Sequence, residues 1–171
     1  MQADELLAAF AVFGAVFAAA SGGDSPRDIR RQYARRPGMP PAWVFEVAWG
    51  ALYLCIGASA YLFWFGRAVG WASTAGAWAL LANLLANRYW TRLYFTYRSV
   101  PLAVLDIALL LATGAFYMFC ALWHMWDVYY FLAALLFAPY MAWTLFALYL
   151  VWRAEQDGSV ATAPEPCARR P

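Results

Sequence analysis

The stretch RPGMPPAWVFEVAWGALYLCIGASAYLFW, residues 36–64, passes from a proline-containing loop directly into a long apolar segment. Pro40 and Pro41 have a fixed φ angle and no backbone N–H, so they suit the irregular chain before a helix and the first turn of the helix itself. The apolar residues that follow predict a helix over about 42–65. We therefore expect a fold built from long apolar helices that begin at loops of this kind.

Composition places the whole chain in a membrane. Of its 171 residues, 65% are hydrophobic and 13% are charged, whereas a soluble domain has about 45–50% apolar and about 25% charged residues. Five runs without charge are each long enough, at about 1.5 Å per helical residue, to cross a hydrocarbon layer of about 30 Å. They are Leu6–Gly23, Val47–Gly66, Ala68–Asn87, Ile107–Trp126 and Val128–Trp152. We predict an all-α fold, a five-helix transmembrane bundle over residues 1–155, followed by a mobile polar C-terminal tail over 156–171.

The first of these runs has a second interpretation, as a secretory signal peptide, because the alanines at 18–20 resemble a cleavage site. A signal peptide begins with basic residues, whereas Asp4 and Glu5 are the charged side chains that precede this run. We therefore expect a retained helix over about 1–21.

The basic residues predict the orientation of the bundle. All twelve are arginines, and with five spans eleven of them fall on the side of the first loop and the C-terminus, which leaves only Arg67 on the opposite side. This asymmetry follows the positive-inside rule. We expect an integral membrane protein in a lipid bilayer, with its first loop and C-terminus on the positive-inside face and no nucleic-acid partner.

Two amides lie within the predicted third helix, about 71–95. Asn83 and Asn87 are four residues apart and so share one face. Buried amides in a bilayer need hydrogen-bond partners, so they either bridge helices or line a polar pocket. The sequence leaves both interpretations open.

Two further polar groups and one proline mark the later helices. Asp106 lies in the second turn of a predicted helix over about 100–122, where we expect it to pair with Arg98 or another arginine, although an intramembrane carboxylate is also a functional candidate. Pro139 interrupts the hydrogen bonds of the last helix, about 128–152, and predicts a kink.

The sequence contains no recognisable catalytic constellation, because it has one histidine, no lysine and no Cys/His cluster. We expect no catalytic residue, no metal site and no required cofactor. The histidine, His124, is typical of an interfacial surface residue, with axial ligation of haem as the alternative.

Aromatic residues are unusually abundant: they make up 19% of the chain and include ten tryptophans. Many lie near span ends, as interfacial belts do. Others lie well inside the spans, where they either pack between helices or form the walls of a pocket for a flat apolar ligand. These are Trp49, Tyr53, Trp78, Tyr140 and Trp143.

Four motifs occur in the order and spacing of a known family. The first loop and second helix read Pro37-x-x-Pro40-Pro41-x-Trp43-Val44-Phe45-x-x-x-Trp49-x-x-Leu52-Tyr53-x-x-x-Gly57. The later motifs are Asn87-x-x-Trp90, Asp106 after Ala103, and Pro139-Tyr140-x-Ala142-Trp143-x-x-Phe146. With them, about residues 5–155 resemble the translocator protein family, also called tryptophan-rich sensory proteins or peripheral benzodiazepine receptors.

The resemblance implies a five-helix bundle, commonly dimeric, that binds porphyrin, haem or a sterol in a pocket open toward the first loop, with a role in transport or sensing. The pocket residues that it implies are Trp49, Tyr53, Asn83, Asn87, Tyr140, Trp143 and Ala147, with Pro40 and Pro41 as a lid. A proposed sterol-recognition pattern is matched by Leu145, Tyr149 and Arg153. For a eukaryotic member, the resemblance implies a mitochondrial membrane.

The sequence departs from the family pattern at several positions. Gly38-Met39 replace the family's tryptophan before the prolines, Thr91-Arg92 replace Pro-Pro, and Val151 replaces asparagine. These departures leave open an alternative, in which the chain is an accessory structural subunit of a larger membrane complex, for example a mitochondrial one, with a degenerate pocket. Porphyrin degradation is the enzymatic alternative, and the missing loop tryptophan argues against it, so we expect a binding protein and not an enzyme.

Overall fold

The computed structural model describes Gly14 and residues 42–66, 68, 70–93, 97 and 99–156. Within these residues the chain forms four α-helices and no strand, which confirms the all-α class. They are α3 (Ala42–Phe65), α4 (Trp71–Thr91), α5 (Val100–Trp123) and α6 (Val128–Gln156). The first predicted span falls outside the described residues except for Gly14, which is helical and exposed. The predicted tail and the lid prolines also lie outside them.

The ends of the helices follow from the backbone chemistry of their flanking residues. α5 has a proline in its first turn, as expected, and α6 continues through Pro139 to Gln156. α4 ends at Thr91, four residues before its predicted end, because its hydrogen bonds change there: the Arg92 N–H bonds to the Tyr89 carbonyl, and the Tyr97 N–H reaches back to the Arg92 carbonyl. These hydrogen bonds span three and five residues instead of the four of an α-helix, which is typical of a helix end.

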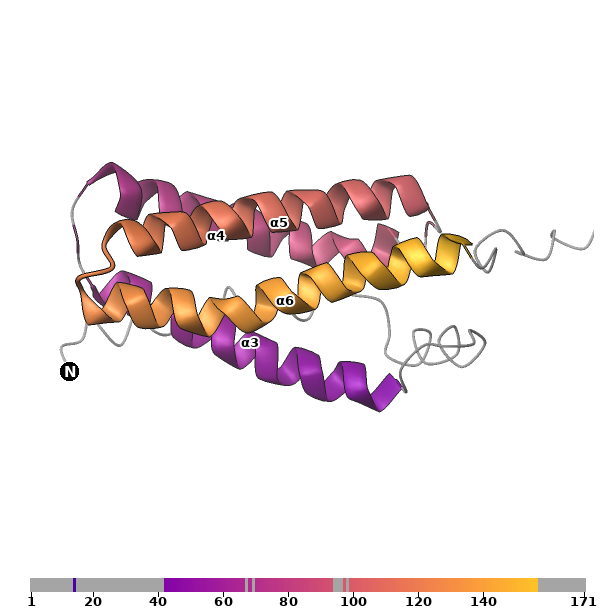
Figure 1. Ribbon diagram of the computed structural model, residues 1–171, viewed down its shortest axis with the longest axis horizontal. Coiled ribbons are helices and arrows are strands. Elements are labelled where there is room, and N and C mark those ends of the chain that lie inside the picture. Colours follow the sequence, from indigo (N-terminus) through magenta and orange to yellow (C-terminus); the bar gives the residue numbers. More distant parts are fainter. Residues whose placement is uncertain are drawn as a thin grey trace, which may run out of the picture.

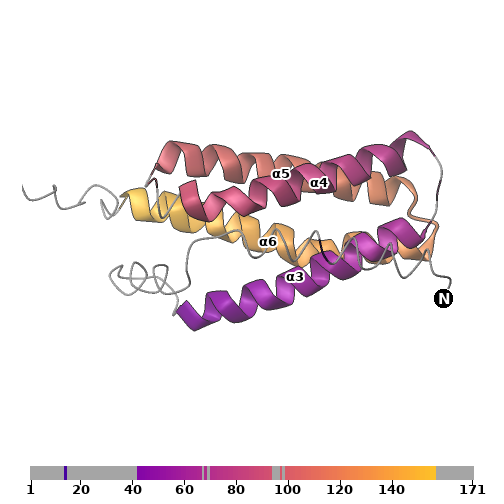
Figure 2. The same cartoon turned by 180° about the vertical axis from the view of Figure 1, so that it is seen from behind.

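The four helices lie side by side in a bundle (Figure 1; Figure 2). α4 packs against α5, α3 against α6, and α5 against α6. Because short turns join consecutive helices, α3 and α5 run one way and α4 and α6 the other. One end of the bundle therefore holds the starts of α3 and α5 and the ends of α4 and α6, and we name it the Gln156 end. The opposite end, with the α3–α4 and α5–α6 turns, is the Trp123 end.

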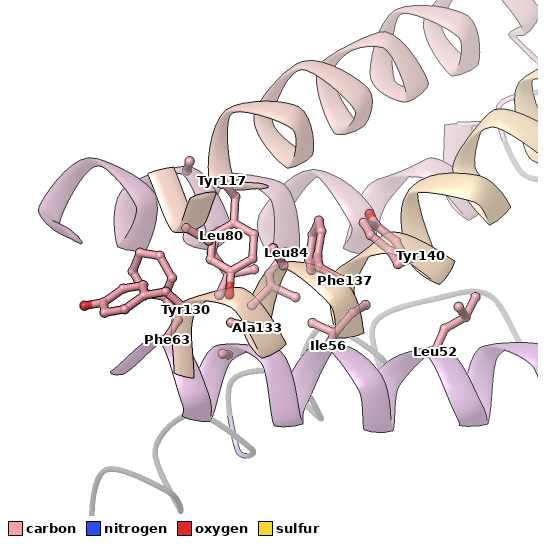
Figure 3. Packing of buried hydrophobic residues seen from close by; sticks show 14 residues of the cluster. Leu52, Ile56, Phe63, Leu80, Leu84, Tyr117, Tyr130, Ala133, Phe137 and Tyr140 are labelled. Atoms are coloured by element: carbon pink, nitrogen blue, oxygen red, sulfur yellow. The ribbon is translucent and has the colours of Figure 1, made fainter. Parts of the chain in front are cut away.

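The buried core is rich in aromatic rings. Tyr117, Tyr130 and Phe137 are fully buried, and Figure 3 shows their rings between the helices, with Tyr130 beside Phe63 of α3. The Tyr117 hydroxyl lies 2.8 Å from Ser59 Oγ, which in turn donates a hydrogen bond of 2.7 Å to a backbone carbonyl of α6. The hydroxyl groups of Ser59 and Tyr117 are thus satisfied by bonds between helices.

The outer surface of the bundle is apolar. Large side chains such as Leu54, Leu105 and Leu135 are more than half exposed, which suits a surface in contact with lipid chains. α3, α5 and α6 are each long and apolar enough to cross a membrane. α4 is of similar length but more polar, since it contains Asn83 and Asn87. This pattern is that of an integral membrane protein. Pro139 of α6 is exposed and lies on the outer surface of the bundle.

Candidate functional site

Five aromatic rings from three helices meet around Trp49, toward the Gln156 end of the bundle. The Trp49 ring stacks on Tyr53 of the same helix at a centroid separation of 5.3 Å and on Trp90 of α4 at 6.1 Å. It also contacts two rings of α6, Trp143 at 6.3 Å and Tyr140 at 6.5 Å. These separations lie in the favourable range for aromatic pairs. We name these five residues the Trp49 cluster.

The two asparagines of α4 have different surroundings, and the first is fully bonded. Asn83 Nδ2 donates to the Leu110 carbonyl at 2.7 Å and to Thr113 Oγ1 at 2.9 Å, both on α5. Asn83 Oδ1 accepts a hydrogen bond of 2.9 Å from the Tyr140 hydroxyl of α6. Asn83 therefore bridges three helices, and it fixes the orientation of one ring of the Trp49 cluster. We name Asn83 and its partners Leu110, Thr113 and Tyr140 the bridged layer.

The second asparagine has no hydrogen bond of this kind. Asn87 is 2% exposed, yet neither Oδ1 nor Nδ2 has a hydrogen-bond partner in the described part of the chain. The Tyr53 hydroxyl is its nearby polar neighbour, but the two groups do not meet at hydrogen-bonding geometry. Asp106 Oδ2 and Trp143 Nε1 are likewise buried without a partner. We name Asn87, Asp106 and Trp143 the unpaired layer.

Asp106 is buried, at 9% exposed, and lies close enough to Tyr140 to interact with it electrostatically. Its predicted partner Arg98 lies outside the described residues, so this pairing stays a prediction. The unpaired oxygen of Asp106 is unusual for a buried carboxyl group, since such groups are normally hydrogen-bonded.

Other predicted residues lie around this cluster or apart from it. Ala147 is half-buried, about one turn beyond Trp143 on α6. Leu145 and Tyr149 are exposed, as is Arg153, so the residues of the sterol pattern form a stripe on the outside of α6 and do not line the interior. Pro40 and Pro41 fall outside the described residues. Their predicted role as a lid is therefore not tested by the structure.

Trp78 does not join the Trp49 cluster. It is 67% exposed, at the opposite side of α4 from Asn83, and lies toward the Trp123 end. There it borders a hollow of about 630 Å³ between α3 and α4, whose walls also include Tyr61 and Ser73. None of the seven pocket residues that the family resemblance implies lines this hollow, and the described part of the chain does not show what covers it.

His124 lies at the Trp123 end, in the turn between α5 and α6. Its ring contacts Tyr130 at 4.9 Å, and its Nε2 is buried without a hydrogen bond. Within the described ranges no three His, Cys, Asp or Glu side chains come together in a way that could hold a metal ion. His124 is thus separated from the Trp49 cluster by most of the length of the bundle.

Sequence reasoning missed two members of the site. Trp90 and Phe45 were both parts of motifs, but neither was predicted to line the pocket. The ring of Phe45 meets that of Trp143 edge-on at 5.3 Å. The signal for Trp90 was present, because it lies three residues after Asn87 and so shares its helix face. Position 151, where the family pattern has asparagine, is a valine here. Val151 is buried in an apolar cluster that also contains Phe45 and Trp90.

Comparisons with known proteins identify the family of the chain. The model of the TspO/MBR family matches residues 6–156. The chain is 34% identical to the translocator protein of Bos taurus over 128 residues, which cover 72% of this chain and 71% of the relative. It is 33% identical to the translocator protein of Homo sapiens over 120 residues, 67% of each chain. It is 30% identical to the tryptophan-rich protein TspO of Archaeoglobus fulgidus over 113 residues, 63% of this chain and 65% of the relative. From the extent of these matches, the chain belongs to the TspO/MBR family.

Proposed function

We propose that this protein binds a flat apolar molecule, a tetrapyrrole such as porphyrin or haem or else a sterol, at the Trp49 cluster, and that it does so as a five-span membrane protein with a transport or sensing role. The observation that carries the proposal is the convergence of five aromatic rings from α3, α4 and α6 around Trp49. Aromatic walls of this kind offer large apolar area and stacking geometry to a planar ring system.

The neighbouring layers support a binding role over a purely structural one. The bridged layer holds Tyr140 in place through Asn83, so one wall of the cluster is fixed before any ligand arrives. Preorganised walls reduce the entropy that binding costs. The unpaired layer leaves polar atoms beside the rings that have no role in holding the helices together.

The test is a titration of the detergent-solubilised protein with protoporphyrin, followed by the quenching of tryptophan fluorescence. Trp49→Ala removes the ring at the centre of the cluster, and since one stacked aromatic pair is worth about 0.5–1.5 kcal/mol beyond its buried area, we expect the Kd for protoporphyrin to rise about tenfold. The matched control is Trp126→Ala, because Trp126 is 94% exposed in the α5–α6 turn and far from the cluster. Its Kd should stay within twofold of the wild-type value.

Competition with cholesterol separates the two ligand classes. If cholesterol displaces protoporphyrin, both occupy the Trp49 cluster. Absence of quenching in the wild-type protein, or an equal rise of Kd in Trp49→Ala and Trp126→Ala, would contradict the proposal and would favour a structural role in a larger assembly.

A further inference from the structure

The hollow between α3 and α4 lies at the Trp123 end of the bundle, away from the Trp49 cluster. Its volume of about 630 Å³ is within the range of small-molecule pockets. None of the ten described residues that line it is charged. Its aromatic residues are Tyr61, Phe63, Trp64, Phe65, Trp78 and Tyr130. An occupant that fits these walls is therefore apolar and uncharged over most of its surface.

Two hydroxyl groups on the walls of the hollow have a hydrogen to donate. Ser73 Oγ is buried and has no hydrogen-bond partner. The Tyr130 hydroxyl accepts from the Ala68 N–H at 3.0 Å but donates to no acceptor among the described residues, and Figure 3 shows it pointing away from the rest of the core. Thr74, the neighbour of Ser73, differs because its hydroxyl donates to the Gly70 carbonyl. Since polar groups inside a protein are normally paired, the two free donors indicate an acceptor within the hollow.

The hollow begins at the level of the membrane interface. Ser73 is the third residue of α4, close to the turn that joins α3 to α4. Trp71 and Trp123 at this end are both more than half exposed, as in an interfacial belt of aromatic residues. Trp78 lies further along α4, about 7–8 Å deeper than Ser73 at about 1.5 Å per residue. The walls thus extend from the interface into the hydrocarbon layer.

We propose that the hollow holds one acyl chain of a neighbouring glycerolipid, and that Ser73 and Tyr130 donate hydrogen bonds to the ester carbonyl of that chain. A carbonyl oxygen has two lone pairs, so it can accept both bonds. The ester groups of a glycerolipid lie between the headgroups and the hydrocarbon, at the level of these two hydroxyls. Trp64 and Trp78 are 61% and 67% exposed, so they form the rim through which the chain enters from the bilayer. This site is independent of the proposed function, because it shares no residue with the Trp49 cluster.

Competition between an ester lipid and an ether lipid tests the role of the carbonyl. The probes are dioleoyl phosphatidylcholine and the dioleyl ether phosphatidylcholine, which has the same headgroup and chain lengths but no ester carbonyl. The full-length protein in an alkyl-glycoside detergent is mixed with equal amounts of both lipids, and native mass spectrometry separates the two complexes by mass. Two hydrogen bonds in a membrane protein are each worth about a factor of two to three, so we expect the wild-type protein to retain the ester lipid about fivefold more than the ether lipid.

Variants of the walls assign this ratio to the two hydroxyls. Ser73→Ala should lower it to about twofold, and Ser73→Ala/Tyr130→Phe should bring it near one. The matched control is Thr74→Ala, which removes the neighbouring hydroxyl that already bonds to the Gly70 carbonyl, so the ratio should stay at the wild-type value. Ala77→Phe places a ring in the hollow from an exposed position of α4, so it should reduce retention of both lipids at least fivefold. Because both lipids are measured on one sample, a loss of folded protein leaves their ratio unchanged.

Four outcomes would overturn the proposal. A wild-type ratio near one would mean that no carbonyl is recognised, and a ratio that persists in Ser73→Ala/Tyr130→Phe would place the preference elsewhere. Unchanged retention in Ala77→Phe would place the lipid on the outside of the bundle. If the wild-type protein retains neither lipid, the hollow is filled by another part of the chain or by a second copy of it. Trp49→Ala should leave the ratio unchanged, whatever its effect on protoporphyrin, so the two proposals succeed or fail separately.

Discussion

The contrast between Asn83 and Asn87 yields a stability prediction with a matched control on the same helix. Asn83→Leu keeps a side chain of similar size but removes three hydrogen bonds between helices. Bonds of this kind in a membrane are worth about 0.6 kcal/mol each on average, so their loss costs about 2 kcal/mol. The Tyr140 hydroxyl then stays buried without an acceptor, which adds about 1–3 kcal/mol. We expect Asn83→Leu to lower the free energy of unfolding by about 3–5 kcal/mol.

Asn87→Leu is the same substitution one turn along the same helix, and its expected effect differs in sign. No hydrogen bond is lost, because neither polar atom of Asn87 has a partner. Removing a buried unpaired amide gains about 1–3 kcal/mol, against about 1 kcal/mol or more for fitting a branched side chain. We expect stability in the absence of ligand to stay unchanged or to rise slightly.

Unfolding of the detergent-solubilised protein, followed by tryptophan fluorescence or circular dichroism during heating, measures the difference. For a chain of this size 1 kcal/mol moves Tm by about 2–4 °C, so Asn83→Leu should melt about 10 °C below the wild-type protein. The double variant Asn83→Leu/Tyr140→Phe should recover a few degrees, because it removes the orphaned hydroxyl. Equal losses of Tm in Asn83→Leu and Asn87→Leu, or a loss below about 2 °C in Asn83→Leu, would refute the division into a bridged and an unpaired layer.

Two further predictions concern the core and the Trp123 end. A Cβ at residue 66 would overlap the ring of Tyr130. The hydroxyl of Tyr130 accepts a hydrogen bond of 3.0 Å from the Ala68 N–H, so this ring cannot move away without losing that bond. Gly66→Ala should therefore lower Tm by several degrees, and no change of Tm would refute this packing. Ser59→Ala and Tyr117→Phe each break the 2.8 Å contact between α3 and α5, so a double-mutant cycle of melting temperatures should show the two losses to be non-additive, whereas strictly additive losses would mean that the contact contributes nothing.

Much of the fold could be predicted from the sequence because the relevant signals are local. Uncharged runs set the lengths of α3, α5 and α6, and prolines mark where helices begin. The end of α4 was predicted four residues too late. Whether the chain there continues as a helix depends on the loop hydrogen bonds that follow it, such as the bond from the Tyr97 N–H to the Arg92 carbonyl.

The candidate site was harder to predict because hydrophobic periodicity loses its meaning in lipid. A soluble helix shows its buried side as an apolar stripe, whereas a helix in a bilayer is apolar on the outside as well. Trp49 and Trp78 both lie inside predicted spans, yet Trp49 contacts four rings and Trp78 faces outward. The difference between the two tryptophans comes from packing between helices, such as that of α3 against α6. The spacing of residues within one helix does not predict which distant segment will pack against it.

The two asparagines illustrate the same limit and also show where function is separated from stability. Both lie on one face of α4, so spacing alone could not decide which bridges helices and which lines a pocket. The partners decide it: the Leu110 carbonyl and the Tyr140 hydroxyl lie level with Asn83, and no such group reaches Asn87. A leucine at position 87 would pack without an unpaired amide, so stability alone does not account for an asparagine there. The polarity of α4, which sets it apart from the other described helices, therefore has two origins: one turn that holds the bundle together, and one turn whose polar atoms the bundle leaves unpaired and that, in our proposal, faces the ligand.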